Sequence, residues 1–342
     1  MVKILLIKRG ALGDLLMATP LIRQLKQLTG GELDIIVGAS AAPAIKANPY
    51  LNQQIILPDK YFTLSGILQL SQVLWRLRSK YNYIFLLDKH WYFNLLAIIC
   101  GARRIGYWRK SWEDGLLNHG VHYYDVTRYH ALYYLDLLAA SGLAIPDYQD
   151  IALDLVITAG EQDQVDLLMK TSGLITMNFV VLVNSGGNNS YESSGIRMLP
   201  ADKVVNLLHH ILNKGYKVVL LGGALDLANY AAYIATINEA ANIFNWAGKL
   251  SLGQSAYLLS QAYKFYTSDC GAMHLGVAVL PATRMIAFFG PSNPAHILPP
   301  LYVELSALWS DQDIYHADYQ LRGVLRKLEP NYFSKLNISA LL

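Results

Sequence analysis

Charged residues are scarce in this sequence. Asp, Glu, Lys and Arg together make up 15% of the 342 residues, and the formal net charge is only +3. So small an excess of positive charge does not support nucleic acid as the partner. The chain is instead apolar and aromatic, with 23 tyrosines and a mean hydropathy of +0.25. This composition is consistent with large cores or with a membrane-proximal, lipid-linked partner.

Long apolar runs and a disulfide framework are missing as well. The run from Ile4 to Ile7 is too short for the hydrophobic region of a signal peptide, and Leu95 to Cys100 is far short of the roughly 18 residues of a transmembrane helix. The two cysteines, Cys100 and Cys270, fall in regions predicted to form separate domains. Their number and spacing fit a reducing compartment, so we expect a cytoplasmic protein.

Several motifs of cofactor and metal chemistry are also absent. The sequence has no G-x-x-x-x-G-K-[S/T] loop, no H-E-x-x-H pair and no C-x-x-C pair, which argues against P-loop, zinc-protease and dithiol classes. Asp311-Gln312-Asp313 has the D-x-D form that some enzymes use to hold a metal. It falls outside the expected strand context, and we interpret it as a helix cap region. We predict no metal site and no bound cofactor.

What the chain does contain is a regular alternation of strand and helix patterns. Short β-branched runs predict strands at Val2 to Lys8, Leu33 to Val37, Ile55 to Leu57, Tyr83 to Leu87, Phe179 to Val183, Lys217 to Leu221, Lys264 to Thr267 and Arg284 to Phe289. Helical spacing predicts helices at Asp14 to Leu28, Ala201 to Leu212, Leu225 to Ala240 and Gly253 to Ala262. The alternation predicts parallel sheets with helices on both faces.

The alternation is interrupted between residues 146 and 176. Pro146, Asp147 and Asp150 break the pattern, and a polar helix is predicted from about Ala159. We therefore predict two Rossmann-like domains, 1–160 and 161–342, with a last helix that either stays with the second domain or packs back on the first. Such domains bind ligands at the carboxyl ends of their strands, so a cleft between the domains is the expected site.

The first candidate loop is Lys8-Arg9-Gly10-Ala11-Leu12-Gly13-Asp14, after the first strand. Its glycines permit close approach of the backbone, and the helix start that follows offers free N–H groups to an anion. The third glycine of the dinucleotide fingerprint is missing, which argues against a NAD-dependent dehydrogenase. Asp14 is either a helix cap or a general base that projects into the cleft.

A second candidate loop, Ser268 to Leu275, follows a strand of the second domain and opens a helix. Asp269 is a candidate cap for this helix. Gly271 has no side chain to block a phosphate at the helix N-terminus. His274, one turn further on, either faces the same ligand or is a buried histidine of the core.

Two further strand ends belong to the same edge. Phe288 to Pro294 is either a turn beside the site or an ordinary Gly-Pro turn. Asn184 to Ser190 is small, polar and glycine-rich, and Arg197 follows soon after. This loop is either a wrap for phosphate or sugar hydroxyls, in which Arg197 neutralises a diphosphate, or a surface loop.

A basic and aromatic segment runs from Arg103 to Trp112. It contains Arg104, Arg109 and Lys110 among two tryptophans and a tyrosine. The segment is either a contact for an anionic, lipid-linked acceptor or a strand and loop with ordinary surface charges, and the sequence does not separate the two.

Several of these motifs resemble one family. Ile7 to Asp14, with Ala18-Thr19-Pro20-Leu21 behind it, is similar to the opening of the lipopolysaccharide heptosyltransferases, glycosyltransferase family 9. Ser268 to Leu275 and Phe289 to Pro294 resemble the donor signature of that family. Two weaker motifs are found in the segments Leu221 to Gly223 and Gly248 to Leu252. Arg197, three residues before Pro200, falls where the family places Lys or Arg, and the motifs span nearly the whole chain in order.

The resemblance implies an α/β GT-B fold, with the acceptor on residues 1–160 and the nucleotide-sugar donor on 161–342. It implies inverting, metal-independent transfer, most commonly of heptose from ADP-heptose to a lipopolysaccharide core or related surface glycan. Asp14 corresponds to the general base. The donor positions are Lys8, Ser185, Arg197, Gly222, Lys249, Asp269, Cys270, Gly271, Ala272 and His274. We expect Arg9, Arg104, Arg109 and Lys110 to meet the lipid-linked or polysaccharide acceptor, with peripheral contact at the inner face of the inner membrane.

Two positions depart from the family pattern. Cys270 replaces the usual Thr, and Gly253 stands where some members carry an acidic residue near the ribose. These departures leave open a GT-B transferase with another nucleotide sugar. A nucleotide-sugar epimerase of the same double-Rossmann architecture and a catalytically inactive binding subunit are the alternatives of other classes.

Overall fold

The computed structural model describes residues 1–59, 63–123, 127–186, 194–290, 292–309, 333 and 336. The chain divides into two compact units, Met1–Val156 and Ile157–Leu342. The division falls a few residues before the boundary that the sequence pattern suggested. Helix α6 (Ala159–Thr171) lies wholly in the second unit because it packs on α9 (Leu252–Gln261), where the Glu161 carboxylate accepts a hydrogen bond from the Ser251 hydroxyl at 2.8 Å.

The N-terminal unit is built on one sheet of six parallel strands in the order β3-β2-β1-β4-β5-β6. The strands are β1 (Lys3–Lys8), β2 (Glu32–Gly38), β3 (Gln53–Leu57), β4 (Tyr83–Leu86), β5 (Arg103–Trp108) and β6 (His119–His122). The helices are α1 (Leu12–Met17), α2 (Thr19–Thr29), α3 (Leu64–Arg76), α4 (Trp91–Ala97) and α5 (His130–Ser141), with 3₁₀ turns η1 (Ala42–Ile45), η2 (Ile98–Cys100) and η3 (Trp112–Leu116).

The C-terminal unit repeats this plan with the strand order β12-β11-β10-β7-β8-β9. The strands are β7 (Phe179–Val183), β8 (Lys217–Leu220), β9 (Ile243–Asn245), β10 (Lys264–Ser268), β11 (Met285–Phe289) and β12 (Ala307–Trp309). Besides α6 and α9 the helices are α7 (Ala201–Asn213), α8 (Leu227–Ile234), α10 (Gly271–Val279), α11 (Pro294–Ile297) and α12 (Pro300–Ser306), with 3₁₀ turns η4 (Ser194–Arg197), η5 (Ala224–Asp226), η6 (Ala240–Asn242) and η7 (Ala282–Arg284).

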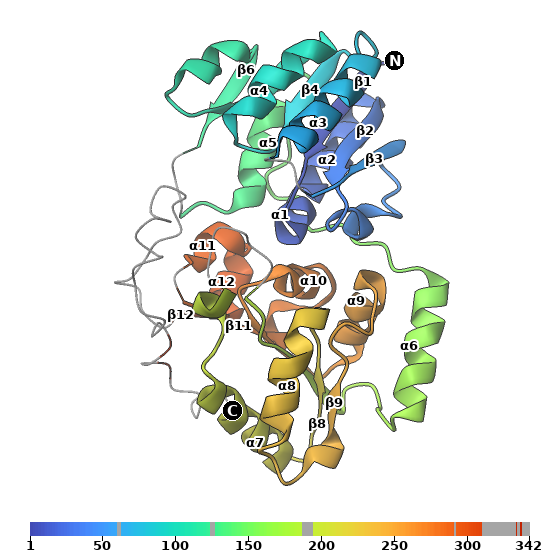
Figure 1. Cartoon of the computed structure of the whole chain (residues 1–342), viewed down its shortest axis with the longest axis vertical. Coiled ribbons are helices and arrows are strands. Elements are labelled where there is room, and N and C mark those ends of the chain that lie inside the picture. Colours follow the sequence, from blue (N-terminus) through green and yellow to red (C-terminus); the bar gives the residue numbers. More distant parts are fainter. Residues whose placement is uncertain are drawn as a thin grey trace. The chain divides into compact units, whose positions relative to one another are not determined.

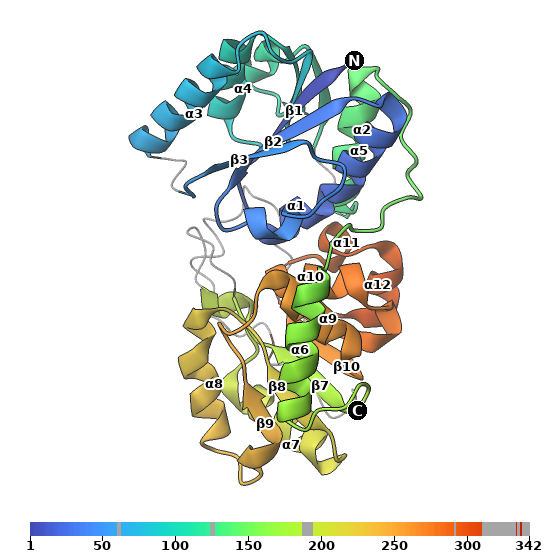
Figure 2. The same cartoon turned by 90° about the vertical axis from the view of Figure 1, so that its right-hand side faces the viewer.

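Each sheet is covered on both faces, as Figures 1 and 2 show. In the N-terminal unit α3 and α4 lie on one face, where Leu5, Ile7 and Leu70 belong to the same buried cluster. Side chains of a strand alternate between faces, so Ile4 and Leu6, also fully buried, point to the other face, which α2 and α5 cover. In the C-terminal unit α7 and α8 bury Val180 and Leu182 of β7, and α9 and α10 cover the opposite face.

Both sheets reverse their strand order at one place, which indicates where a ligand is expected to bind. The reversal lies between β1 and β4 in the first sheet and between β7 and β10 in the second. Open α/β sheets bind ligands outside the carboxyl ends of the strands at such a point. The loops that follow these four strands are therefore the first candidates for a functional site in each unit.

The sequence analysis erred mainly on short elements. It missed β6, β9 and β12, which have only three or four residues each and carry little periodic signal, and it left β5 undecided between a strand and an acceptor contact. It also expected one helix from Asp14 to Leu28, whereas α1 ends at Met17 and α2 begins at Thr19. Pro20 stands in the first turn of α2, where its missing N–H costs nothing but where it favours a new helix start.

Candidate functional site

In the N-terminal unit a buried lysine joins two aspartates at the reversal point. Lys8 is the last residue of β1, and its ammonium donates to Asp88 Oδ1 at 2.7 Å and to Asp14 Oδ2 at 3.1 Å. Asp88 comes two residues after β4, and its other oxygen accepts the backbone N–H of Arg9 at 2.6 Å. The pairing of β1 with β4 thus brings together carboxylates that lie 74 residues apart in the chain.

Burial and the neighbouring charges shift the pKa of Lys8 in opposite directions. Its side chain is 5% exposed, and burial alone would lower the pKa of the ammonium. The negative charges of Asp88 and Asp14 outweigh that effect and raise the pKa of Lys8 above its ordinary value. Lys8 is therefore a permanent cation at neutral pH, held by one buried and one accessible carboxylate.

Asp14 is accessible to a ligand, since its side chain is 42% exposed. It lies inside α1, whose cap position is Ala11 and which has no side-chain cap. The interpretation of Asp14 as a helix cap is therefore wrong. Its carboxylate accepts from the Lys8 ammonium.

Asp88 and Lys89 are site residues that the sequence analysis missed. They follow directly on the strand that was predicted at Tyr83 to Leu87, so the rule of inspecting each strand end would have found them. Lys89 Nζ lies 3.2 Å from the ring centroid of Tyr123 and 5.8 Å from that of Tyr107. Burial lowers the pKa of Lys89, and the negative charge of Asp14 acts in the opposite direction.

The four basic residues expected at the acceptor differ in their accessibility. Arg9 is buried, with 1% exposure, and its guanidinium donates to the Pro58 carbonyl. Arg104 is half-buried and donates to the carbonyl groups of Leu116 and Ala102. Arg109 and Lys110 are exposed. Of the four, only these last two present their side chains to solvent.

In the C-terminal unit a serine hydroxyl links the two strands at the reversal point. Ser268, the last residue of β10, donates to the Ser185 carbonyl at 2.6 Å and accepts the Ser185 N–H at 2.9 Å. Ser185 follows β7 by two residues. The predicted donor loops, around Ser185 and around Asp269, are thus fastened to each other.

Arg197 and Asp269 form an ion pair beside this link. Arg197 Nη1 lies 3.1 Å from Asp269 Oδ2, and the Asp269 side chain is 4% exposed. The expectation that Asp269 caps the following helix is wrong, because the cap position of α10 is Cys270 and no side chain caps this helix. Gly271 and Ala272 form the first turn of α10 and are partly exposed, whereas His274 is buried.

The loops after β8 and β9 complete this edge of the sheet. The N–H of Gly248 donates to the Gly222 carbonyl at 2.9 Å. Gly248 has a φ of +70°, and a Cβ there would lie 3.0 Å from the Ala224 backbone. Left-handed φ and close approach both require glycine. Lys249, the next residue, is exposed.

Gly253, the second departure from the family pattern, has a local structural reason. A Cβ at this position would lie 2.3 Å from Glu161 Oε1. The Glu161 carboxylate is fixed there by the hydroxyl groups of Ser251 and Thr158. A carboxylate from α6 therefore occupies the start of α9, where no side chain of residue 253 fits without displacement.

Both thiols should resist chemical modification in the folded protein. Cys100 and Cys270 are free and buried, and burial raises the pKa of each. Because the thiolate is the reactive form, a raised pKa lowers its fraction at neutral pH. We expect a chromogenic disulfide reagent to label neither thiol until denaturant is added. Rapid labelling of Cys270 in the native protein would contradict this position for the donor loop.

Some expectations cannot be placed. The D-x-D segment 311–313, residues 187–190 of the predicted loop Asn184 to Ser190, and the last helix lie outside the described residues. Within the part of the chain that the structure describes, no three His, Cys, Asp or Glu side chains form a group able to hold a metal ion. No helix in this same part is long and apolar enough to cross a membrane.

Known proteins match this chain over most of its length. The model of glycosyltransferase family 9 (heptosyltransferase) matches residues 71–319. The chain is 26% identical to lipopolysaccharide heptosyltransferase 2 of Salmonella typhimurium, covering 87% of this chain and 85% of the relative. It is 24% identical to lipopolysaccharide heptosyltransferase 3 of Escherichia coli K12, with 82% and 80% covered.

Solved structures agree in fold. A family 9 glycosyl transferase from Veillonella parvula superposes with a TM-score of 0.79 at 19% identity and covers 99% of this chain and 95% of its own. The E. coli ADP-heptose lps heptosyltransferase II gives a TM-score of 0.71 at 22% identity, with 99% of both chains covered. The predicted α/β GT-B fold is confirmed, and the family match over 71–319 supports the transferase over the epimerase alternative. This chain belongs to glycosyltransferase family 9, the heptosyltransferase family.

Proposed function

We propose that this chain transfers a heptose from ADP-heptose to a lipopolysaccharide core acceptor, with inversion and without a metal. Relatives that cover most of the chain bear the name lipopolysaccharide heptosyltransferase. One structure of the same fold is an E. coli heptosyltransferase with ADP-2-deoxy-2-fluoro heptose, at a TM-score of 0.66. The N-terminal unit would take the acceptor and the C-terminal unit the donor.

The observation that carries the proposal is the geometry around Asp14. An accessible carboxylate lies at the carboxyl end of the central strand β1, held 3.1 Å from the Lys8 ammonium. A general base needs an accessible carboxylate and a fixed position; the Asp14 side chain is 42% exposed and is held by Lys8. We assign Lys8 first to the orientation of Asp14, because two carboxylates already surround its ammonium.

The C-terminal unit offers positive charge for a diphosphate. The first turn of α10 presents the backbone N–H groups of Gly271 and Ala272, and helix N-termini bind phosphate groups. Arg197 is 24% exposed and anchored by Asp269, so its remaining donors can reach a phosphate oxygen. These groups supply the role that a divalent cation has in other transferases.

The reaction follows from these assignments. An acceptor hydroxyl oxygen attacks the anomeric carbon from the face opposite the diphosphate, and Asp14 takes its proton. As the new C–O bond forms, the bond to the diphosphate breaks, and its electron pair leaves with ADP. Arg197 and the N-terminus of α10 stabilise the charge that develops there. One displacement gives inversion at the anomeric carbon.

A ligand panel tests the donor assignment. We expect calorimetric titration in EDTA to show binding of ADP and ADP-heptose, with GDP and UDP much weaker. NMR of the product should show the inverted anomeric configuration, formed without added metal. Preference for GDP or UDP would leave the transferase class but refute ADP-heptose, and epimerised donor without acceptor would refute the transfer itself.

Arg197 is the donor-site residue with the clearest expected effect. Charge-assisted hydrogen bonds contribute about 1.5–3 kcal/mol, so Arg197→Gln should weaken ADP-heptose binding by roughly 10- to 100-fold. Arg284→Gln is the matched control, because Arg284 in the same unit donates to the backbone at Ser260 and Ala262. Equal donor affinity in Arg197→Gln and the wild type would refute the assignment.

A further inference from the structure

Helix α3 has an outer face that is unusual for a water-exposed helix. Leu64, Leu68 and Trp75 are 74%, 52% and 63% exposed, and their spacing of four and eleven residues places them on one side of the helix. Arg76 is the only charged residue in the thirteen of α3. An exposed helix face normally carries charged residues, and α6, also of thirteen residues, has Glu161, Asp163, Asp166 and Lys170.

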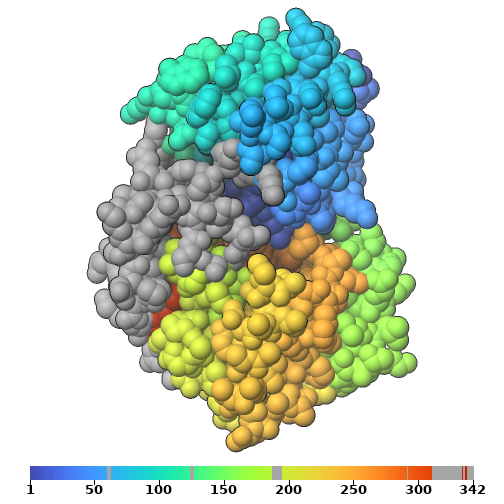
Figure 3. Space-filling view, viewed as in Figure 1, coloured from blue at the N-terminus to red at the C-terminus, as the bar shows by residue number. Residues whose placement is uncertain are grey.

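The apolar face continues onto the neighbouring elements. Helix α3 packs on α4 and η2, and α4 packs on η3. On these elements Trp91, Ile98 and Trp112 are exposed, and the rings of Trp91 and Trp112 lie 5.9 Å apart. Figure 2 shows α3 and α4 on the same side of the first sheet, and Figure 3 shows α3, in light blue, at the molecular surface. We call this region the α3–α4 face.

The charges around the α3–α4 face are mostly positive. Residues 63–112 contain eight of the 28 Lys and Arg but only one of the 25 Asp and Glu. That one is Asp88, 13% exposed and paired with Lys8. Arg76, Arg78 and Lys80 are exposed, and the Arg78 guanidinium lies 5.2 Å from the Trp75 ring centroid. The chain as a whole is nearly balanced, so its positive charge is concentrated here.

We propose that the α3–α4 face docks on the surface of an anionic phospholipid bilayer. Exposed tryptophan and leucine beside arginine and lysine match the interfacial region, where indole rings lie at the headgroups and basic side chains meet lipid phosphates. Acidic groups are few on these elements: Asp88 is paired with Lys8, and Asp114 of η3 is half-buried and accepts the N–H groups of Arg109 and Lys110. The positive charge that remains is complementary to an anionic surface and would gain nothing from a neutral one.

This docking also places the N-terminal site next to the membrane. Helix α4 begins three residues after Asp88, and Arg109 Nη1 donates to the Lys89 carbonyl. The α3–α4 face therefore ends beside Asp88 and Lys89. The benefit of this proximity rests on the proposed function, because a lipid-linked acceptor would reach Asp14 while its lipid stays in the bilayer.

Vesicle sedimentation tests the proposal. The whole chain should bind vesicles of phosphatidylglycerol and phosphatidylethanolamine, weakly bind pure phosphatidylcholine, and dissociate at high salt. Leu68→Glu/Trp75→Glu should lower binding by at least about tenfold, and Arg76→Gln/Lys80→Gln by about fivefold per charge removed. The control Leu167→Glu/Ile175→Glu changes equally exposed residues of the other unit and should bind as the wild type does.

Several outcomes would overturn the proposal. Equal binding to neutral and anionic vesicles would do so, as would wild-type binding by Leu68→Glu/Trp75→Glu. A third such outcome is that the wild type forms a dimer in solution and that this variant is monomeric, because the face would then bind a second copy of the chain. Vesicle binding is measured without a nucleotide sugar, so its result is independent of which donor the chain uses. A chain that bound anionic vesicles but did not turn over ADP-heptose would refute the proposed function alone. Normal turnover of a soluble, delipidated acceptor by Leu68→Glu/Trp75→Glu shows that the variant is folded.

Discussion

Asp14→Asn should reduce the turnover number by about 10²–10⁴-fold, the usual contribution of a general base. The amide keeps the size of the side chain and can still accept from Lys8, but it cannot take a proton from the acceptor. Donor affinity should stay close to that of the wild type, because Asp14 belongs to the N-terminal unit and Arg197 and Gly271 to the other. Single-turnover rates together with calorimetric titration of ADP-heptose measure both quantities.

Asp150→Asn is the matched control for this variant. Asp150 lies in the same unit, is 40% exposed, and pairs with the buried Arg23 at 2.8 Å, so it resembles Asp14 in exposure and in its partner. Its partners Arg23 and Gln24 lie on α2, outside the loops that follow β1 and β4, so turnover should be unchanged. If Asp14→Asn kept wild-type turnover, or if both variants lost it equally, Asp14 would not be the base.

The fold could be predicted from the sequence wherever strands are apolar and buried. The strand expected at Phe179 to Val183 agrees with β7 to the residue, because β-branched and aromatic residues fill it and it lies in the centre of its sheet. Strand β5 (Arg103–Trp108) was left undecided, because its two arginines among aromatic residues fit an acceptor contact as well as a strand and loop. The missed strands β6, β9 and β12 lie at the edges of their sheets, where a strand has one neighbour and its sequence is less constrained.

The site was only half predictable, for a different reason. The glycine-containing loop after β1 and the aspartate that follows it form a local motif, and this motif identified Asp14 as a candidate base. Asp88 has no such motif, and its role appears only when β4 pairs with β1 and places its carboxylate 2.7 Å from Lys8. Likewise, Asp14 and Asp269 read as helix caps in sequence, but their carboxylates bind Lys8 and Arg197. The choice between a helix cap and a site residue therefore depended on contacts between residues far apart in the chain, which the local sequence does not show.

The Lys8–Asp88 pair predicts the largest effect on stability. Lys8→Met removes the ammonium and leaves the Asp88 carboxylate, which is 13% exposed, with the hydrogen bond from the Arg9 N–H. Breaking a buried pair in this way costs about 3–5 kcal/mol. The Asp14 side contributes little, because an accessible carboxylate is well solvated. Hydrogen exchange of peptides from β1 and β4 should therefore accelerate strongly, while peptides from the C-terminal unit should not change.

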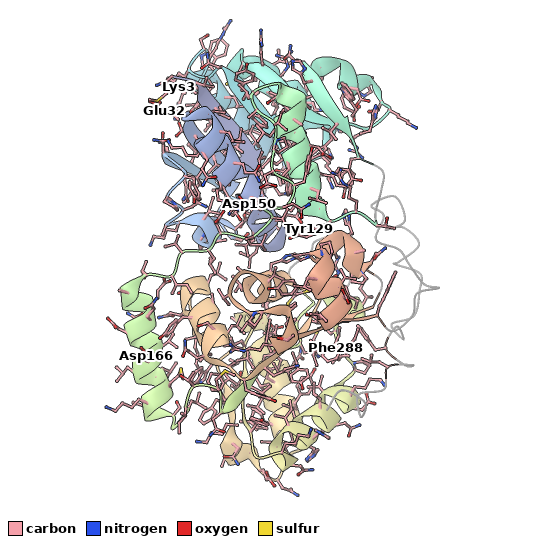
Figure 4. The ribbon with its side chains drawn as sticks, turned by 180° about the vertical axis from the view of Figure 1, so that it is seen from behind. Lys3, Glu32, Tyr129, Asp150, Asp166 and Phe288 are labelled. Atoms are coloured by element: carbon pink, nitrogen blue, oxygen red, sulfur yellow. The ribbon has the colours of Figure 1, made fainter. Side chains whose placement is uncertain are left out.

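Two further variants separate a buried charge from a lost contact. Lys8→Met/Asp88→Asn removes both charges, and its amide oxygen can still accept from Arg9, so it should regain most of the protection that Lys8→Met loses. Lys3→Met breaks the ion pair with Glu32 at the opposite end of the same strand (Figure 4). The two charged groups of this pair are 2.8 Å apart, but both side chains are exposed to solvent. It should have no measurable effect. If the double variant were as unstable as Lys8→Met, the loss would come from the packing of the lysine stem, and the uncompensated Asp88 charge would not be its cause.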